Sequence, residues 1–163
     1  MNSELMDLVN EKDEVIGSAP RPEIYEKRLR HRIAHVIIFN DAGEMALQFR
    51  AKKQGFFGNS WVTSAGGHVH SGESYEEAAM REMKEEIGVA PKIKLAYVDL
   101  YAGHNLLKFL HTFTATHNGP FTPNPLEVQK VEFFSLTEIK QMLARGEKFH
   151  PELVFLLEKH YFK

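Results

Sequence analysis

Three glutamates in one short stretch, Glu82, Glu85 and Glu86, point most directly to chemistry in this sequence. At positions i, i+3 and i+4 of a helix, their carboxylates share one patch within a single turn. This patch lowers stability, because like charges four residues apart repel by about 0.2–0.5 kcal/mol per pair. Each anion near the C-terminal end of a helix costs on the order of a further 0.3–1 kcal/mol. A bound divalent cation would reverse the sign of both effects.

The types of these side chains favour a hard cation. Carboxylate oxygens suit Mg²⁺ or Mn²⁺, and the absence of cysteine excludes disulfides, thiolate catalysis and thiol-based metal sites. The alternative is a glutamate-rich helix face that is merely solvated, which is the commoner origin of such a charge run. The placement of the charges at the wrong end of the helix, just before a stop at Gly88, favours the metal site.

A helix that ends at Gly88 must position these carboxylates. Residues 74–77 (Ser-Tyr-Glu-Glu) have the spacing of a capping box, and Gly88 is a typical C-terminal stop. Ala79, Met83 and Ile87 recur at i, i+4 and i+8 and predict its buried stripe. Before the helix, we expect Gly66-Gly67 to break a strand and lead into a loop over residues 68–72.

The other elements follow from hydrophobic patterns and turn signals. We predict a hairpin over residues 5–9 and 14–16, a strand buried on both faces over 35–39, a returning strand over 44–50, a loop over 52–59, an extended segment over 61–63, and strands over 93–100, 108–114 and 128–134. Two helices should begin after Ser135 and at Pro151. The charged residues 21–32 are expected to form a surface connection or edge, whose basic side chains either meet a substrate phosphate or, as we favour, are solvated.

Composition and order together indicate one globular α+β domain over residues 1–163, with residues 1–20 as a hairpin extension. The chain is 43% hydrophobic and 26% charged, and its net charge of −2 offers no basic excess for long nucleic acid. No signal-peptide pattern opens it, and no apolar run approaches the roughly 20 residues that span a bilayer. We therefore expect a cytoplasmic protein without a membrane partner. The irregular order of strands and helices favours an α+β sandwich around a mixed sheet.

The segment from Gly67 onwards resembles the complete Nudix box. All nine specified positions match without a gap over residues 67–89: Gly67, then Glu73, then the run from Arg81 to Val89 (Arg-Glu-Met-Lys-Glu-Glu-Ile-Gly-Val). The resemblance implies the α/β/α sandwich of that family. It also implies hydrolysis of a diphosphate linked to another group, usually a small nucleoside diphosphate derivative, by attack of water on phosphorus.

The same resemblance implies roles for the box residues. The three glutamates would ligate Mg²⁺ or Mn²⁺, and the backbone carbonyl near Gly67 would complete the shell. Glu73 and Arg81 would pair to hold the loop against the helix. Glu82 or Glu86 could also act as the base, whereas in other family members the base comes from a later loop.

Glu127, just before the last expected strand, is our candidate for such a base from a later loop. An exposed loop carboxylate without a catalytic role is an equally good interpretation of Glu127.

Residues outside the box resemble the isopentenyl-diphosphate-isomerase-like branch of the family: residues 30–32, 36–40 and 48–50, Lys53 and Trp61. We predict that Arg50 and Trp61 contact the substrate. Isomerase activity itself is disfavoured, because that reaction needs a cysteine just before the Gly67-His68 pair, where this chain has Gly66. His31 and His68 are not counted as metal ligands, since a lone histidine is more often structural.

The identity of the substrate leaves little trace in the sequence. Five aromatic side chains could stack on a base or line a pocket, although core packing is favoured for each: Phe56, Phe57, Trp61, Tyr101 and His104. The leading hypothesis is a metal-dependent hydrolase of a small diphosphate. The alternatives are a non-catalytic Nudix module that senses a nucleotide and a metal-binding structural domain. The N-terminal hairpin has little core of its own, so it either forms a homodimer contact or extends the sheet within one subunit.

Overall fold

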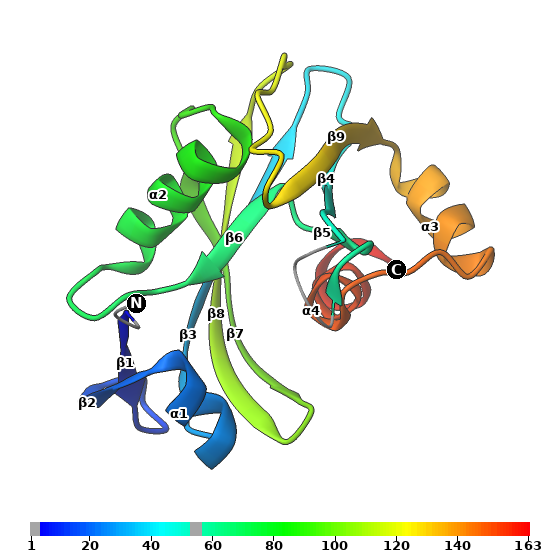
Figure 1. Ribbon diagram of the computed structural model, residues 1–163. Helices are drawn as coiled ribbons and strands as arrows, with labels where there is room; N and C mark the ends of the chain where they lie inside the picture. Colours follow the sequence, from blue (N-terminus) through cyan, green and yellow to red (C-terminus); the bar gives the residue numbers. More distant parts are fainter. Residues whose placement is uncertain (1–3, 53–56) are drawn as a thin grey trace.

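Figure 1 shows the computed structural model, which describes residues 4–52 and 57–163. Its strands are β1 (Leu5–Val9), β2 (Val15–Pro20), β3 (His31–Phe39), β4 (Met45–Arg50), β5 (Trp61–Val62), β6 (Ala65–His68), β7 (Lys94–Gly103), β8 (Leu106–Thr116) and β9 (Val128–Phe134). Its helices are α1 (Arg21–Lys27), α2 (Tyr75–Ile87), α3 (Leu136–Ala144) and α4 (Pro151–Leu156), which continues into a π-helical turn, Leu157–Tyr161. No helix within these described ranges is long and apolar enough to cross a membrane.

Strand β3 is the centre of a mixed sheet. It pairs in parallel with β8 and antiparallel with β6, and β8 pairs antiparallel with the edge strand β7. β3 meets β4 at Phe39 and Met45, and β4 then carries β5 and β9 as a second group of antiparallel strands. β1 and β2 form a separate hairpin. These pairings confirm the predicted α+β fold around a mixed sheet with an N-terminal hairpin.

The alternating residues of β3 supply the cores on both faces of the sheet. Val36 and Ile38 pack with the α2 residues Met83 and Ile87, and all four are completely buried. Ile37, between them, joins the opposite cluster with residues of β4, α3 and α4. Figure 1 shows the same arrangement, with α2 on one side of the sheet and α3 and α4 on the other. The prediction of a strand buried on both faces is therefore confirmed.

Helix α2 begins and ends where the sequence predicts. The Ser74 side chain accepts a hydrogen bond from the Glu77 backbone N–H at 3.0 Å, and the Ser74 N–H donates to the Glu77 carboxylate at 2.9 Å. Gly88 ends the helix in the left-handed conformation with φ of 68°. A Cβ there would lie 2.9 Å from the Thr122 Cβ, so both conformation and space favour glycine.

Two local predictions were wrong. Residues 21–27, expected to be a surface connection or edge, form α1, because Pro20 and Pro22 start a short helix whose Ile24 is completely buried against the hairpin. Gly66-Gly67 does not break a strand but lies within β6, paired with His35 and Ala34 of β3.

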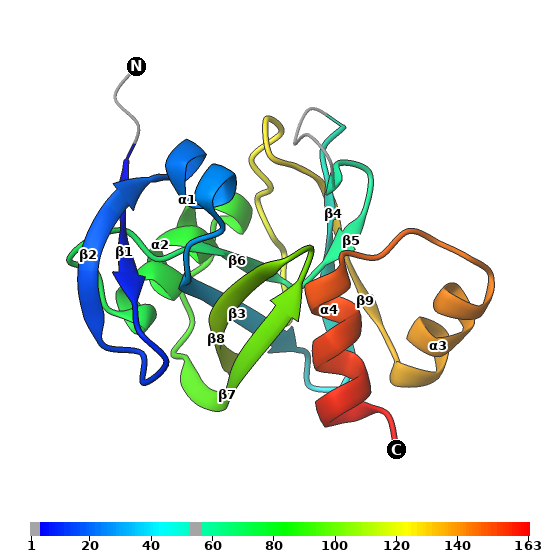
Figure 2. The same ribbon diagram turned by 90° about the horizontal axis from the view of Figure 1, so that it is seen from below.

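The hairpin is fastened to the rest of the molecule through Asp13 in its turn. Figure 2 shows β1, β2 and α1 at the end of the molecule opposite α3. The Asp13 carboxylate accepts hydrogen bonds from Arg32 of β3 at 2.8 Å and from the Tyr75 hydroxyl of α2 at 2.7 Å. Asp13 has φ of 62°, a left-handed conformation that aspartate and asparagine tolerate. One turn residue thus connects the hairpin to both the central strand and the box helix.

Changing Asp13 to Asn keeps the turn conformation but removes the charge that faces Arg32. We expect the free energy of unfolding to fall by about 1–3 kcal/mol, because a largely buried guanidinium loses its anion. Glu11→Gln is the matched control, since Glu11 lies in the same turn with its side chain 78% exposed and 4.0 Å from Arg30. The control should cost less than about 0.5 kcal/mol. Urea denaturation followed by circular dichroism measures both variants, and equal losses would contradict this role of Asp13.

Candidate active site

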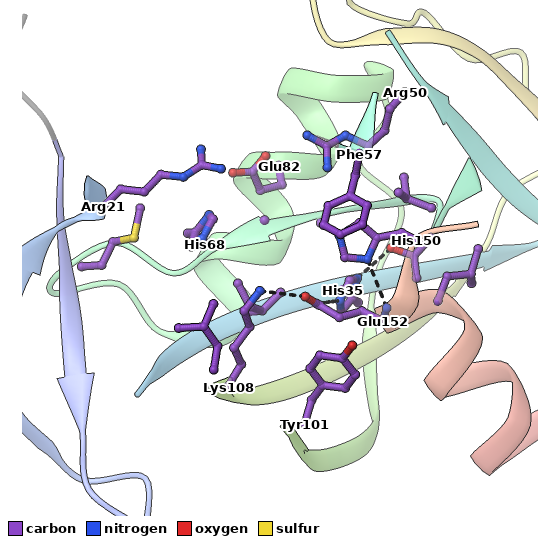
Figure 3. Close-up of a pocket in the computed structure, with 18 of the residues that line it drawn as sticks. Arg21, His35, Arg50, Phe57, His68, Glu82, Tyr101, Lys108, His150 and Glu152 are labelled. Atoms are coloured by element: carbon purple, nitrogen blue, oxygen red, sulfur yellow. Dashed lines mark hydrogen bonds and ion pairs between the residues drawn. The ribbon is translucent and has the colours of Figure 1, made fainter. Parts of the chain in front are cut away.

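Glu82, Glu85 and Glu86 line a cavity of about 1120 Å³. Its wall is built from α1, β3, β4, β6, α2, the β7–β8 hairpin and α4, so elements from the whole chain meet there. Figure 3 shows Glu82 and Arg50 on one side of this cavity and Lys108, Glu152 and Tyr101 on the other. The structure therefore brings Gly67, Arg81, Glu82, Glu85, Glu86, Glu127 and Arg50 to one cavity.

Glu82 packs directly on the glycine backbone of β6. Its side chain is 13% exposed, and a Cβ built on Gly67 would lie 2.6 Å from the Glu82 Oε1. A Cβ on Gly66 would lie 2.8 Å from the Ala34 carbonyl oxygen of β3. Glycine is therefore needed at these two positions because β6 lies very close to both α2 and β3, and not because the strand is interrupted there. Burial raises the pKa of Glu82 to about 7.

Glu86 lies one turn further along α2 and is deeper. Its Oε1 accepts hydrogen bonds from the Gly66 N–H at 2.9 Å and from the Gln48 side-chain amide at 3.3 Å. Both donors are neutral. Burial, and next the neighbouring charge of Glu82, raise the pKa of Glu86 well above its usual range. Two carboxylates thus share a region of the wall where their charge is poorly compensated.

Arg81 and Glu73 fasten the loop before α2 to the helix. The Arg81 guanidinium donates to both Glu73 oxygens, at 2.7 and 3.0 Å, and to the His68 carbonyl oxygen at 3.1 Å. The Glu73 carboxylate also accepts from the His70 N–H at 2.9 Å. Burial opposes ionisation of Glu73, but the hydrogen bonds from Arg81 outweigh it and lower the pKa of Glu73. This is the bidentate geometry of a strong charge-assisted pair.

Arg81 also forms ion pairs with two of the candidate metal ligands, Glu82 and Glu85. Its Nη1 lies 2.8 Å from Glu82 and 3.4 Å from Glu85, whose side chain is 53% exposed. Within residues 4–52 and 57–163, no three His, Cys, Asp or Glu side chains are gathered closely enough to hold a metal ion as they stand. The chemistry of the donor set nevertheless fits a hard divalent cation, because it consists of carboxylates of which two are half-buried beside a glycine backbone. Binding would require Glu85 to turn away from Arg81.

Glu127 lines the same cavity from the segment before β9. Its backbone carbonyl accepts from the Ala51 N–H at 2.9 Å, which places it beside the end of β4. Burial, and next the charge of Glu85, raise the pKa of Glu127. A carboxylate held near the others but not bonded to Arg81 in the described residues has the chemistry of a proton acceptor.

The two predicted substrate contacts lie in different places. Arg50 lines the cavity and points into it (Figure 3), and burial lowers the pKa of this guanidinium while the charge of Glu86 acts in the opposite direction. Trp61 is 4% exposed and packs between Phe49 and Phe134, with ring centroids 4.8 and 5.1 Å away. Trp61 is not among the cavity residues. The prediction that it contacts the substrate is therefore wrong for this cavity, and Trp61 packs in the core instead.

The other aromatic candidates divide in a similar way. Phe57, Tyr101 and His104 line the cavity, whereas Phe56, like the Lys53 of the flanking resemblance, lies outside the described residues. His68 also lines the cavity, and its ring stacks on His31 with centroids 5.5 Å apart. Burial lowers the pKa of His31 to about 4, so this ring is neutral at physiological pH.

A buried polar network forms the floor of the cavity, and sequence reasoning missed it. Glu152, at the start of α4, accepts hydrogen bonds from His35 and from the Lys108 ammonium, both at 2.9 Å. Burial opposes the charge of Glu152, but these two partners outweigh it and hold the pKa of Glu152 well below its usual range. An acidic residue after a helix-starting proline is commonplace, so nothing in the local pattern marks Glu152 as buried.

Comparisons with known proteins agree with the geometry of this site. The NUDIX domain family matches residues 29–157. An uncharacterised Nudix hydrolase of Yersinia pestis is 31% identical over 150 residues, which cover 91% of this chain and 81% of the relative. A crystal structure from Deinococcus radiodurans superposes with a TM-score of 0.85 at 27% identity, covering 98% of this chain and all of that one.

A more distant neighbour shares the fold alone. The NUDIX domain of Shewanella oneidensis NrtR, solved in complex with ADP ribose, has a TM-score of 0.65 at 15% identity and covers 86% of this chain and 96% of its own. The likeness to the isomerase-like branch stays a prediction, because none of these relatives carries that name. The family match, the relatives and the box residues gathered at one cavity show that this chain belongs to the Nudix hydrolase family.

Proposed function

We propose that this Nudix protein is a pyrophosphohydrolase that cleaves the diphosphate linkage of a small nucleoside diphosphate derivative, with Mg²⁺ or Mn²⁺ as cofactor. The observation that carries the proposal is the half-buried carboxylate pair of Glu82 and Glu86 on the wall of a large cavity. Arg81 shares its single charge among three carboxylates, and Glu86 accepts hydrogen bonds from neutral donors only, as far as the described residues show. The excess negative charge is what a divalent cation would neutralise.

The metal would be held by Glu82, Glu85 and Glu86 with the Gly67 carbonyl. When bound, the cation neutralises phosphate charge and lowers the pKa of water. Proton transfer and the positioning of the reactants would be carried out by side chains of the protein. Glu127 accepts a proton from the attacking water, whose oxygen forms the new bond to phosphorus while the P–O bond of the anhydride breaks.

Other residues of the site would orient the reactants. Arg50 binds a phosphate oxygen, and the Glu73–Arg81 pair positions the loop that carries Gly67. The Shewanella oneidensis domain supports the substrate class, since a fold of this kind accommodates a nucleoside diphosphate derivative there. Cavity residues such as Glu152, Lys108 and Tyr101 are polar, which favours a polar organic group over a hydrocarbon chain.

Single changes of Glu82, Glu85 or Glu86 to Gln should lower kcat by at least about 100-fold, because each removes a charged metal ligand. The measurement is ³¹P NMR of turnover with Mg²⁺ and Mn²⁺ on nucleoside di- and triphosphates, nucleotide sugars and dinucleoside polyphosphates. Glu76→Gln is the matched control, since Glu76 is an exposed residue in the first turn of the same helix. A chelator should abolish turnover of the wild type.

Two results of this experiment would contradict the proposal. Turnover that survives in all three variants would exclude the box glutamates as ligands. A wild type that binds nucleotides, as shown by a raised melting temperature, yet cleaves none of them would instead indicate a nucleotide-sensing module.

Glu127→Gln tests the proton acceptor separately. We expect kcat to fall by about 10²–10⁴-fold with little change in KM, because the amide cannot take up a proton from water. Glu132→Gln serves as the control, since Glu132 lies on the following strand with its side chain 47% exposed and pairs with Lys130. If Glu127→Gln keeps the kcat of the wild type, the base must be Glu82 or Glu86 instead.

A further inference from the structure

The segment before residue 29 lies outside the part of the chain that the family matches, yet it forms one wall of the cavity. We call residues 4–28, which comprise β1, β2 and α1, the N-terminal extension. It contributes Glu4, Met6, Arg21, Pro22, Tyr25 and Arg28 to the lining. The cavity therefore extends beyond the segment that the family matches.

The N-terminal extension is held firmly against the core. The Leu5 carbonyl accepts from the Ser71 N–H at 2.8 Å, and the Val9 N–H donates to the Arg30 carbonyl at 3.1 Å. Ile24 of α1 is completely buried in a cluster with Met6 of β1. The extension is therefore preorganised: the backbone of its residues is held in place before a ligand binds.

Arg21 lies on this wall of the cavity, between two prolines in the sequence. Pro20 and Pro22 restrict the backbone on either side of it, and the side chain points into the cavity on the side of His68 and Glu82 (Figure 3). Its guanidinium carbon lies 5.6 Å from the centroid of the Tyr25 ring. The Tyr25 hydroxyl is in turn hydrogen-bonded to the His68 ring at 2.8 Å.

Arg21 differs from two other cations of the cavity in its partners. Arg81 is bonded to Glu73 and Lys108 to Glu152. Arg21 forms no ion pair with a carboxylate in the described parts of the chain, and its guanidinium lies over the Tyr25 ring. The planar guanidinium group of Arg21 is thus available to an anion. It matches the geometry of phosphate, to which it can donate two parallel hydrogen bonds.

The opposite side of the cavity is aromatic. Phe57 packs against His150 with ring centroids 4.3 Å apart and against His104 at 5.7 Å. Figure 3 shows Arg21 and Phe57 on opposite sides of the cavity, with Glu82 between them. A diphosphate held at the carboxylates would therefore direct one end towards Arg21 and the other towards the aromatic side chains.

We infer that Arg21 binds the terminal phosphate of the substrate, whose organic group lies on the Phe57 side, an assignment that rests on the proposed diphosphate hydrolysis. Arg21 lies at an exposed edge of the cavity, where its guanidinium can donate two parallel hydrogen bonds to phosphate oxygens. A free terminal phosphate also carries more negative charge than an esterified one. The preferred substrates are therefore nucleoside di- or triphosphates rather than nucleotide sugars.

Two assays with the folded, full-length protein test this assignment. The first measures by calorimetry the Kd of α,β-methylene ADP, a non-hydrolysable probe, with Mg²⁺ present. The second measures kcat and KM for ADP and for an ADP sugar. The variants are Arg21→Gln and Arg21→Lys, with Lys27→Gln as the control. Lys27→Gln removes one positive charge from the same helix, but Lys27 pairs with Glu23 and does not line the cavity.

We expect Arg21→Gln to raise the Kd of the probe and the KM for ADP by about 10-fold, the effect of one charge-assisted hydrogen-bonded contact. The KM for the ADP sugar should change by less than about 2-fold, and Arg21→Lys should give an intermediate loss for ADP because lysine cannot bind in the bidentate manner. Lys27→Gln should match the wild type. Equal Kd values for Arg21→Gln and Lys27→Gln would overturn the assignment, and so would equal losses on ADP and the ADP sugar.

The calorimetric assay separates this inference from the proposed function. A wild type that hydrolyses no diphosphate would refute the proposed hydrolysis, and the Kd of the probe would still decide whether Arg21 binds its terminal phosphate. Conversely, normal hydrolysis with an unchanged Kd in Arg21→Gln would refute the role of Arg21 alone.

Discussion

The close approach of α2 to the glycine backbone of β6 is the constraint on which the site depends. With no side chain at Gly66 or Gly67, β6 can pair with β3 and lie under the carboxylates of Glu82 and Glu86. The buried stripe of α2 and the Glu73–Arg81 ion pair hold the helix in that position. Packing energy from the apolar face of the helix thus offsets the cost of gathering like charges on its polar face.

The rest of the cavity is assembled by long-range contacts around this centre. The Lys108–Glu152–His35 network brings α4 to the central strands, and the Asp13 contacts bring the N-terminal hairpin to β3 and α2. One wall is therefore acidic and the facing floor contains the Lys108–Glu152 ion pair, so a ligand that spans both must itself be strongly polar.

Local patterns predicted the elements whose signals are local. The capping box at Ser74 and the stop at Gly88 gave the limits of α2, and the apolar run in β3 gave its burial on both faces. Other features depend on partners remote in sequence. His35 and Glu152 are 117 positions apart, and the burial of Trp61 depends on Phe134 of β9, so neither follows from a local pattern. Helix α1 was missed because its one fully buried residue, Ile24, is hidden in a charged segment.

We propose that Glu82 and Glu86 form a cation site, and direct binding of Mn²⁺ tests this proposal without reference to turnover. Electron paramagnetic resonance of free Mn²⁺ during titration with the protein gives the Kd. We expect the wild type and Glu76→Gln to take up Mn²⁺ equally, and Glu86→Gln to bind Mn²⁺ at least about 10-fold more weakly. A wild type that leaves the Mn²⁺ signal unchanged, or a Glu86→Gln variant that binds as well as the wild type, would contradict it.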